Sequence, residues 1–149
     1  MSKRELIAAV LLGGFFLVGF IGHSLPATLP WMLSMTPYTL LACGLIAFFP
    51  VFLERKPGVL LWALLVYVIT FILEALGTAT GKIFGPYTYG RTLGPMLFDV
   101  PLVIAFNWLM IILGALSLAQ LIFRRRLTIA VAAAVLAAGF DYLLEPTAI

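Results

Sequence analysis

Carboxyl groups set in apolar sequence are the residues of this chain best suited to chemistry. Glu74 lies near the end of one apolar run, Asp99 precedes another, and Asp141 and Glu145 close a third. An ionisable side chain at membrane depth is costly, so each is a candidate functional group. Asp141 and Glu145 are four residues apart and share a helical face. A carboxyl buried without a close cation keeps its proton to higher pH and can transfer it.

Three of these acids also have structural interpretations. Glu145 precedes Pro146, and a place at the membrane interface is the alternative for it. Asp99 precedes Val100-Pro101, a pattern typical of a helix N-cap with proline in the first turn. Glu74 has two cations within reach along the sequence, Lys82 and Arg91, and an ion pair with either would make it a structural residue. The sequence leaves these alternatives open beside the catalytic ones.

The residues that follow Glu74 indicate how its helix presents it. Gly77, Thr78 and Gly81 lie three, four and seven positions further on, so all four residues share one helical face. Small residues on that face permit close approach of another helix or of a flat ligand. Thr78 is therefore a candidate substrate-binding residue, and ordinary helix packing is the alternative.

Aromatic and amide side chains complete the candidate binding site. Phe84, Tyr87 and Tyr89 are predicted to form either an aromatic wall for a lipid-like substrate or a belt at the membrane interface. Asn107 and Trp108 lie about two turns into the next apolar run. Asn107 is polar at depth, which predicts a hydrogen bond to a neighbouring helix or a role in orienting substrate or water.

Composition places these residues in a membrane. Of 149 residues, 64% are hydrophobic and 10% are charged, whereas soluble domains are about half apolar and a quarter charged. Each of five apolar runs is near the roughly 17–25 residues that span a bilayer as a helix. Their approximate limits are Leu6 to Gly22, Trp31 to Leu53, Val59 to Ala79, Val100 to Phe123 and Leu127 to Leu144. We expect an all-α polytopic bundle of about five transmembrane helices, forming one domain over residues 1–149 in the cell membrane.

The Lys and Arg residues predict an orientation, because short cytoplasmic loops carry an excess of them. One side has Lys3, Arg4, Arg55, Lys56 and Arg124 to Arg126; the other has Lys82 and Arg91. The N-terminus should be cytoplasmic, with the first helix retained rather than cleaved as a signal. Glu74, Asp99, Asp141 and Glu145 then all lie at the outer level.

Several function classes are disfavoured. His23 and Cys43 are the chain's single histidine and single cysteine, so we expect no metal site. The cations form short clusters between apolar spans rather than a basic stripe, which argues against nucleic-acid binding. Phosphate-binding and Rossmann glycine motifs are missing from the sequence, as are hydrolase and zinc-protease motifs.

Two strings carry a family resemblance. From Glu74 the chain reads E-A-L-G-T-A-T-G-K-I-F-G-P-Y-T-Y and then G-P-M-L-F-D-V-P-L-V-I-A-F-N-W, and residues 140–146 read F-D-Y-L-L-E-P. These segments resemble the membrane carotenoid biosynthesis family that includes carotenoid 1,2-hydratases and bisanhydrobacterioruberin hydratase. The matches run from about Val66 to Pro146, roughly half of the chain.

The resemblance implies hydration of a terminal C1–C2 isoprenoid double bond of an acyclic or monocyclic carotenoid, without a cofactor. A carboxylic acid would protonate the alkene, and a water activated by a carboxylate would capture the tertiary cation. Glu74, Asp99 and Asp141 are the expected catalytic residues, with Asp99 as acid and Glu74 or Asp141 as base. Aromatic faces, among them Trp108, would stabilise the cation. A membrane lycopene cyclase and a non-catalytic carotenoid-binding or scaffold subunit are the alternatives.

The chain departs from the family in its length. Members continue beyond the E-P segment with further hydrophobic sequence, whereas this chain stops at Ile149. We expect either a missing C-terminal helix or a short branch of the family. The expected partners are the carotenoid, membrane lipid, and further copies of the chain or other carotenoid enzymes that complete the pocket.

Overall fold

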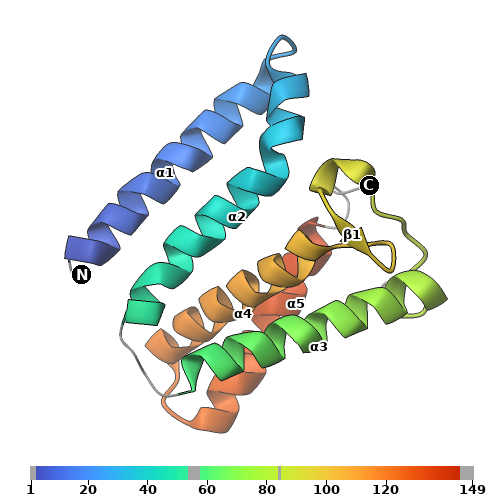
Figure 1. The fold of residues 1–149 in the computed structure, drawn as a ribbon. Helices are drawn as coiled ribbons and strands as arrows, with labels where there is room; N and C mark the ends of the chain where they lie inside the picture. Colours follow the sequence, from blue (N-terminus) through green and yellow to red (C-terminus); the bar gives the residue numbers. More distant parts are fainter. Residues whose placement is uncertain (1–2, 54–57, 84, 145–149) are drawn as a thin grey trace. The chain divides into compact units, whose positions relative to one another are not determined.

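The computed structural model describes residues 3–53, 58–83 and 85–144, and five α-helices account for most of them (Figure 1). The helices are α1 (Lys3–Ser24), α2 (Leu29–Leu53), α3 (Val59–Thr80), α4 (Leu102–Ile122) and α5 (Arg126–Leu144). All five are long and apolar enough to cross a membrane. The predicted all-α class is confirmed, and the protein is a multi-pass membrane protein. The cytoplasmic N-terminus stays a prediction.

The described residues divide into two compact units, with the boundary between Asn107 and Trp108 in α4. In the second unit, α4 and α5 pack through small side chains. The buried residues of this seam are Ala115, Ala119, Ala133 and Ala137. Each helix contributes an alanine pair spaced by four, which is the kind of small-residue spacing that occurs where membrane helices pack. The single domain predicted for residues 1–149 stays a prediction.

The first unit opens with a hairpin of α1 and α2, in which the Met32 side chain packs on Gly22. A Cβ at Gly22 would lie 2.5 Å from Met32 Sδ, so the Met32 side chain would have to move to accommodate it. The Thr28 hydroxyl donates a 2.6 Å hydrogen bond to the Gly22 carbonyl and fixes the connection. α2 continues through Pro37 and Pro50 without interruption.

A short β-hairpin joins α3 to α4, preceded by the 3-10 turn η1 (Arg91–Leu93). Strand β1 (Met96–Leu97) pairs antiparallel with β2 (Val100–Pro101) around a two-residue turn. Both turn residues have positive φ, 52° at Phe98 and 61° at Asp99. Positive φ at both central positions is the type I′ pattern, whose twist matches that of paired strands.

The hairpin corrects the predicted start of the fourth helix. We expected Asp99 to cap a helix that began at Val100, but α4 begins at Leu102 and Pro101 belongs to β2. The Leu102 N–H donates to the Pro95 carbonyl at 3.0 Å, so a backbone group satisfies it. Asp99 adopts a left-handed conformation that its short polar side chain tolerates, and it serves the turn instead of the helix.

The hairpin is held against α3. Val100 is fully buried and Pro101 nearly so, and β2 packs along α3. The Tyr67 hydroxyl of α3 donates a 3.0 Å hydrogen bond to the Leu102 carbonyl. These contacts hold the segment between α3 and α4, drawn in yellow in Figure 1, against α3.

Candidate active site

One stripe of α3 is buried, and Glu74 lies in it. The buried members of α3 are Ala63, Thr70, Glu74 and Gly77, separated by seven, four and three positions. This spacing is that of a single helical face, and the half-buried Thr78 and Gly81 lie beside it. The predicted face of Glu74, Gly77, Thr78 and Gly81 is therefore confirmed as the side of α3 that packs inward.

The Glu74 carboxyl group is the centre of the site. Its residue is 4% exposed, so it is almost fully removed from the surface. The Tyr87 hydroxyl donates to Glu74 Oε2 at 2.5 Å, and the Tyr89 hydroxyl donates to the same oxygen at 2.7 Å. Two phenol donors thus converge on one carboxyl oxygen. Both distances lie within the usual range of O–H···O hydrogen bonds.

The two tyrosines reach the same oxygen because of their spacing. Around them, exposure alternates along the chain: Pro86, Thr88 and Gly90 are exposed, while Tyr87 and Tyr89 are half-buried. In extended backbone, residues two apart project to the same side. Their rings meet edge to face, with centroids 5.2 Å apart and an interplanar angle of 88°. This is a favoured geometry for an aromatic pair.

The end of α3 returns the chain toward Glu74. The helix ends at Thr80, and Gly81 follows in the left-handed region at φ 63°, donating its N–H to the Gly77 carbonyl at 2.7 Å. Glycine is suited to this C-terminal position because it has no Cβ to clash. The Thr78 hydroxyl donates to the Glu74 carbonyl at 2.8 Å, which places its side chain on the Glu74 turn.

Burial keeps both phenols protonated. It raises the pKa of Tyr89 well above its ordinary range, and the hydrogen bond and negative charge of Glu74 raise it further. Burial, followed by the hydrogen bond to Glu74, also raises the pKa of Tyr87, against the opposing effect of hydrogen bonds with Thr78 and Tyr89. Both tyrosines are therefore O–H donors over the whole neutral pH range, and they present aromatic rings beside a buried carboxyl group.

The other predicted site residues lie in different surroundings. Asp99 is exposed at the β-hairpin turn, and Asn107 is half-buried in the part of α4 that belongs to the first unit. Trp108 and Asp141 belong to the second unit, where both are half-buried. Phe84 lies outside the described residues. Among the part of the chain that the structure describes, no group of three potential metal ligands occurs.

One residue that holds the site together, Tyr67, was not predicted from the sequence. Tyr67 lies seven positions before Glu74 on the same side of α3, and its hydroxyl ties the start of α4 to that helix. A polar group two turns from a buried acid was the available signal. Tyr67 lies in a strongly apolar run, where a tyrosine is also an ordinary packing residue.

The comparisons with known proteins agree on one family. A family model described as "Carotenoid biosynthesis protein" matches residues 35–149. Bisanhydrobacterioruberin hydratase of Haloarcula japonica is 32% identical over 134 residues, which cover 84% of this chain and 44% of that protein. The chain thus spans less than half the length of this relative. No solved structure matches the chain.

Proposed function

The chain belongs to the carotenoid biosynthesis protein family, and from this premise we propose that it hydrates a terminal C1–C2 isoprenoid double bond of an acyclic or monocyclic carotenoid. The single observation that carries the proposal is the buried Glu74 carboxyl group with two phenol donors on one oxygen. The name of the Haloarcula japonica relative supports hydration over other reactions of carotenoids.

The reaction needs a proton donor, a proton acceptor and a site that shields a cation. A carboxylic acid gives its proton to C2, and the π electrons of the double bond form the new C–H bond. C1 is then a tertiary cation. A water oxygen forms a bond to C1 while a carboxylate takes one of the water protons. The product is a tertiary alcohol that contains one added water, and the proton held by the base returns to the acid.

Glu74 fits the role of proton acceptor in this scheme. Glu74 Oε2 accepts hydrogen bonds from the Tyr87 and Tyr89 hydroxyls, and these two donors hold the carboxyl group in one orientation. A carboxylate buried in this way has few solvent water molecules to screen it, so its charge acts strongly on a nearby cation. We therefore propose Glu74 as the base that activates water.

The two tyrosines have a double role in the proposal. Their hydroxyls orient the Glu74 carboxylate, and their rings offer π faces to the developing cation. Attraction of a cation to an aromatic face contributes about 2 kcal/mol or more when the site is desolvated. The raised pKa of Tyr89 serves this role, since a phenolate beside Glu74 would add a second negative charge and lose the donor.

The acid that protonates the alkene is assigned on sequence grounds. We propose Asp99 for this step, with Asp141 as the alternative carboxyl for either role. Thr78, Phe84, Asn107 and Trp108 are proposed to contact the polyene. A general acid or base of this kind contributes roughly 100- to 10,000-fold to a rate, so each carboxyl can be tested by its amide variant.

The test is expression of this chain in bacteria that accumulate lycopene, followed by chromatography and mass spectrometry of the pigments. Hydratase activity gives a more polar pigment that is heavier by one water, and Glu74→Gln abolishes it. Glu5→Gln is the matched control, because it makes the same change at the other end of the first unit, in an exposed residue of α1. An isomeric product indicates a cyclase, and an unchanged pigment that copurifies with the chain indicates a binding subunit.

A further inference from the structure

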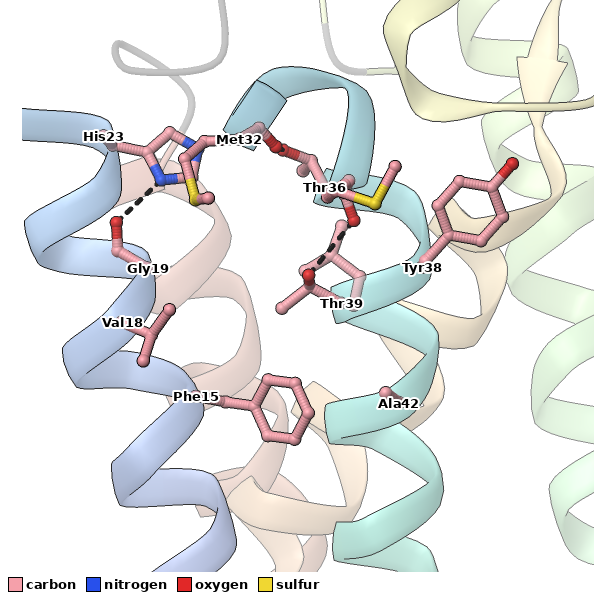
Figure 2. Close-up of a pocket in the computed structure, with 11 residues that line it drawn as sticks. Phe15, Val18, Gly19, His23, Met32, Thr36, Tyr38, Thr39 and Ala42 are labelled. Atoms are coloured by element: carbon pink, nitrogen blue, oxygen red, sulfur yellow. Dashed lines mark hydrogen bonds between the residues drawn. The ribbon is translucent and has the colours of Figure 1, made fainter. Parts of the chain in front are cut away.

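A cavity of about 510 Å³ that is open on one side lies between α1 and α2, away from Glu74 in the sequence and lined by other residues (Figure 2). Its volume is within the roughly 300–1,000 Å³ of small-molecule sites. Its apolar lining consists of Phe15, Val18, Met32, Met35, Leu40 and Ala42. Its polar lining consists of His23, Thr36, Tyr38 and Thr39. The cavity is therefore apolar with a few polar groups.

The shape of the cavity follows from how the two helices meet. They touch where the Met32 side chain packs on Gly22. From His23 to Phe15, α1 runs about 12 Å at 1.5 Å per residue. A second hollow of about 810 Å³ shares Phe15, Gly19, His23 and Thr39 with the first. The two hollows are thus continuous along α1, on the side of the helix that faces α2.

The polar groups of the cavity offer lone pairs rather than protons. His23 Nδ1 lies 2.8 Å from the Gly19 carbonyl, which only accepts, so Nδ1 carries the proton and neutral His23 has its lone pair on Nε2. The Thr36 hydroxyl donates to the Met32 carbonyl at 2.9 Å. The Thr39 hydroxyl donates to the Met35 carbonyl at 3.1 Å. Each of these side chains therefore donates its hydrogen bond to a carbonyl of its own helix.

Tyr38 does not change this pattern. Its phenol can donate, but the residue is 65% exposed, and Figure 2 shows its ring on the side of α2 that faces away from α1. A ligand in the cavity meets hydrogen-bond acceptors around an apolar body. The ligand that suits such a lining has an apolar chain and a hydroxyl proton to donate.

We propose that the cavity between α1 and α2 binds the hydroxylated end of an isoprenoid, with its hydroxyl donating to His23 Nε2 or to a threonine oxygen and its chain lying along Phe15 and Val18. The isoprenoid skeleton follows from the family, and the hydroxyl follows from the lining. Neither depends on catalysis at Glu74. The site therefore holds an alcohol whether this chain produces it or receives it.

The test compares one alcohol with its hydrocarbon. The full chain in lipid nanodiscs is titrated with radiolabelled geranyllinalool, a tertiary isoprenoid alcohol, and with the hydrocarbon in which hydrogen replaces the hydroxyl. One hydrogen bond contributes about 0.5–1.5 kcal/mol, so the alcohol should bind roughly 2- to 12-fold more tightly. His23→Phe keeps a ring and removes the acceptor, and Thr39→Val keeps the shape of the side chain. At least one of them should reduce the preference toward unity.

Two controls separate this site from its surroundings. Thr80→Val removes a threonine that also donates to its own helix, at the Leu76 carbonyl, but lies outside the cavity, and it should keep the preference. Glu74→Gln should keep it as well, which distinguishes failure of this site from failure of the hydratase. Equal binding of alcohol and hydrocarbon would show a groove for lipid acyl chains and overturn the proposal, as would a preference that persists in both His23→Phe and Thr39→Val.

Discussion

The Tyr89 hydroxyl donates a 2.7 Å hydrogen bond to Glu74 Oε2 across fifteen residues of chain. The contact joins the inward face of α3 to the segment that follows the helix, and the Tyr87 hydroxyl donates to the same oxygen at 2.5 Å. A buried carboxyl group, two phenols and the turn at Gly81 thus form one structural unit. The turn explains why Tyr87 and Tyr89 lie close to Glu74.

Loss of one phenol should destabilise the protein. Tyr89→Phe removes a donor from a carboxyl group that is 4% exposed, and a buried polar group left with fewer partners costs about 1–3 kcal/mol. Tyr142→Phe makes the same change at a residue that is 74% exposed and should cost less than about 0.5 kcal/mol. The free energy of unfolding, measured in mixed micelles by denaturing detergent, gives both values. Equal losses in the two variants would contradict the proposed contact.

Alkaline pH should weaken the fold through the same residues. Tyrosine in an unfolded chain loses its proton near pH 10, and burial raises the pKa of both Tyr87 and Tyr89 in the folded protein. Above about pH 10 the unfolded state therefore holds fewer protons, and the free energy of unfolding falls as pH rises. Below that pH their contribution is intact.

Substitution can show whether Tyr87 and Tyr89 cause this loss of stability at alkaline pH. The double variant Tyr87→Phe/Tyr89→Phe lacks both phenols and should show a shallower fall of unfolding free energy above about pH 10 than the native protein. An identical slope in the two proteins would mean that other groups cause the loss.

The turn at Gly81 should resist replacement. Gly81→Ala forces a side chain into the left-handed region, at a cost of about 1–2 kcal/mol, and should reduce hydratase activity because the turn returns the tyrosines to Glu74. Gly81→Asn should cost less. Gly114→Ala is the control, because a Cβ there meets nothing within 4 Å and alanine favours a helix. Thermal unfolding measures the loss of stability, and pigment yield measures the loss of activity. If Gly81→Ala changes neither, the turn at Gly81 is not needed to bring the tyrosines to Glu74.

The orientation of the helices is a separate prediction. Because Lys and Arg concentrate on one side, the N-terminus should be cytoplasmic and the segment between α3 and α4 should lie outside. A reporter that is active in the periplasm should therefore work when it is inserted at Thr88 and fail when it is fused to the N-terminus. The reverse pattern would invert the topology and the outer placement of Glu74.

The sequence was sufficient for the helices because apolar run length decides them in a membrane. The run predicted from Val59 to Ala79 differs by one residue from α3 (Val59–Thr80), and the run from Leu127 to Leu144 by one residue from α5 (Arg126–Leu144). The start of α4 was misplaced because Asp-Val-Pro is a typical opening of a helix. The turn at Phe98 and Asp99 lacks the asparagine and glycine that usually mark such a hairpin.

The sequence predicted part of the candidate site around Glu74. Burial of Glu74 and its shared face with Thr78 were readable from helical spacing. The hydrogen bonds from Tyr87 and Tyr89 were not, because they depend on where the chain turns after Gly81, and an aromatic wall or an interfacial belt fitted the same residues. The roles of Asp99 and Asp141 stay predictions.

Isotope labelling of the product shows whether this chain adds water to the terminal double bond and whether Glu74 is required. The purified chain is incubated with lycopene in nanodiscs prepared with heavy-oxygen water, and in parallel with heavy water. Hydration at C1 predicts a tertiary alcohol whose oxygen comes from the solvent, with one non-exchangeable deuterium at C2, and neither label in the Glu74→Gln variant. A product that takes up deuterium without oxygen, or native protein and Glu74→Gln that incorporate both labels equally, would contradict hydration by Glu74.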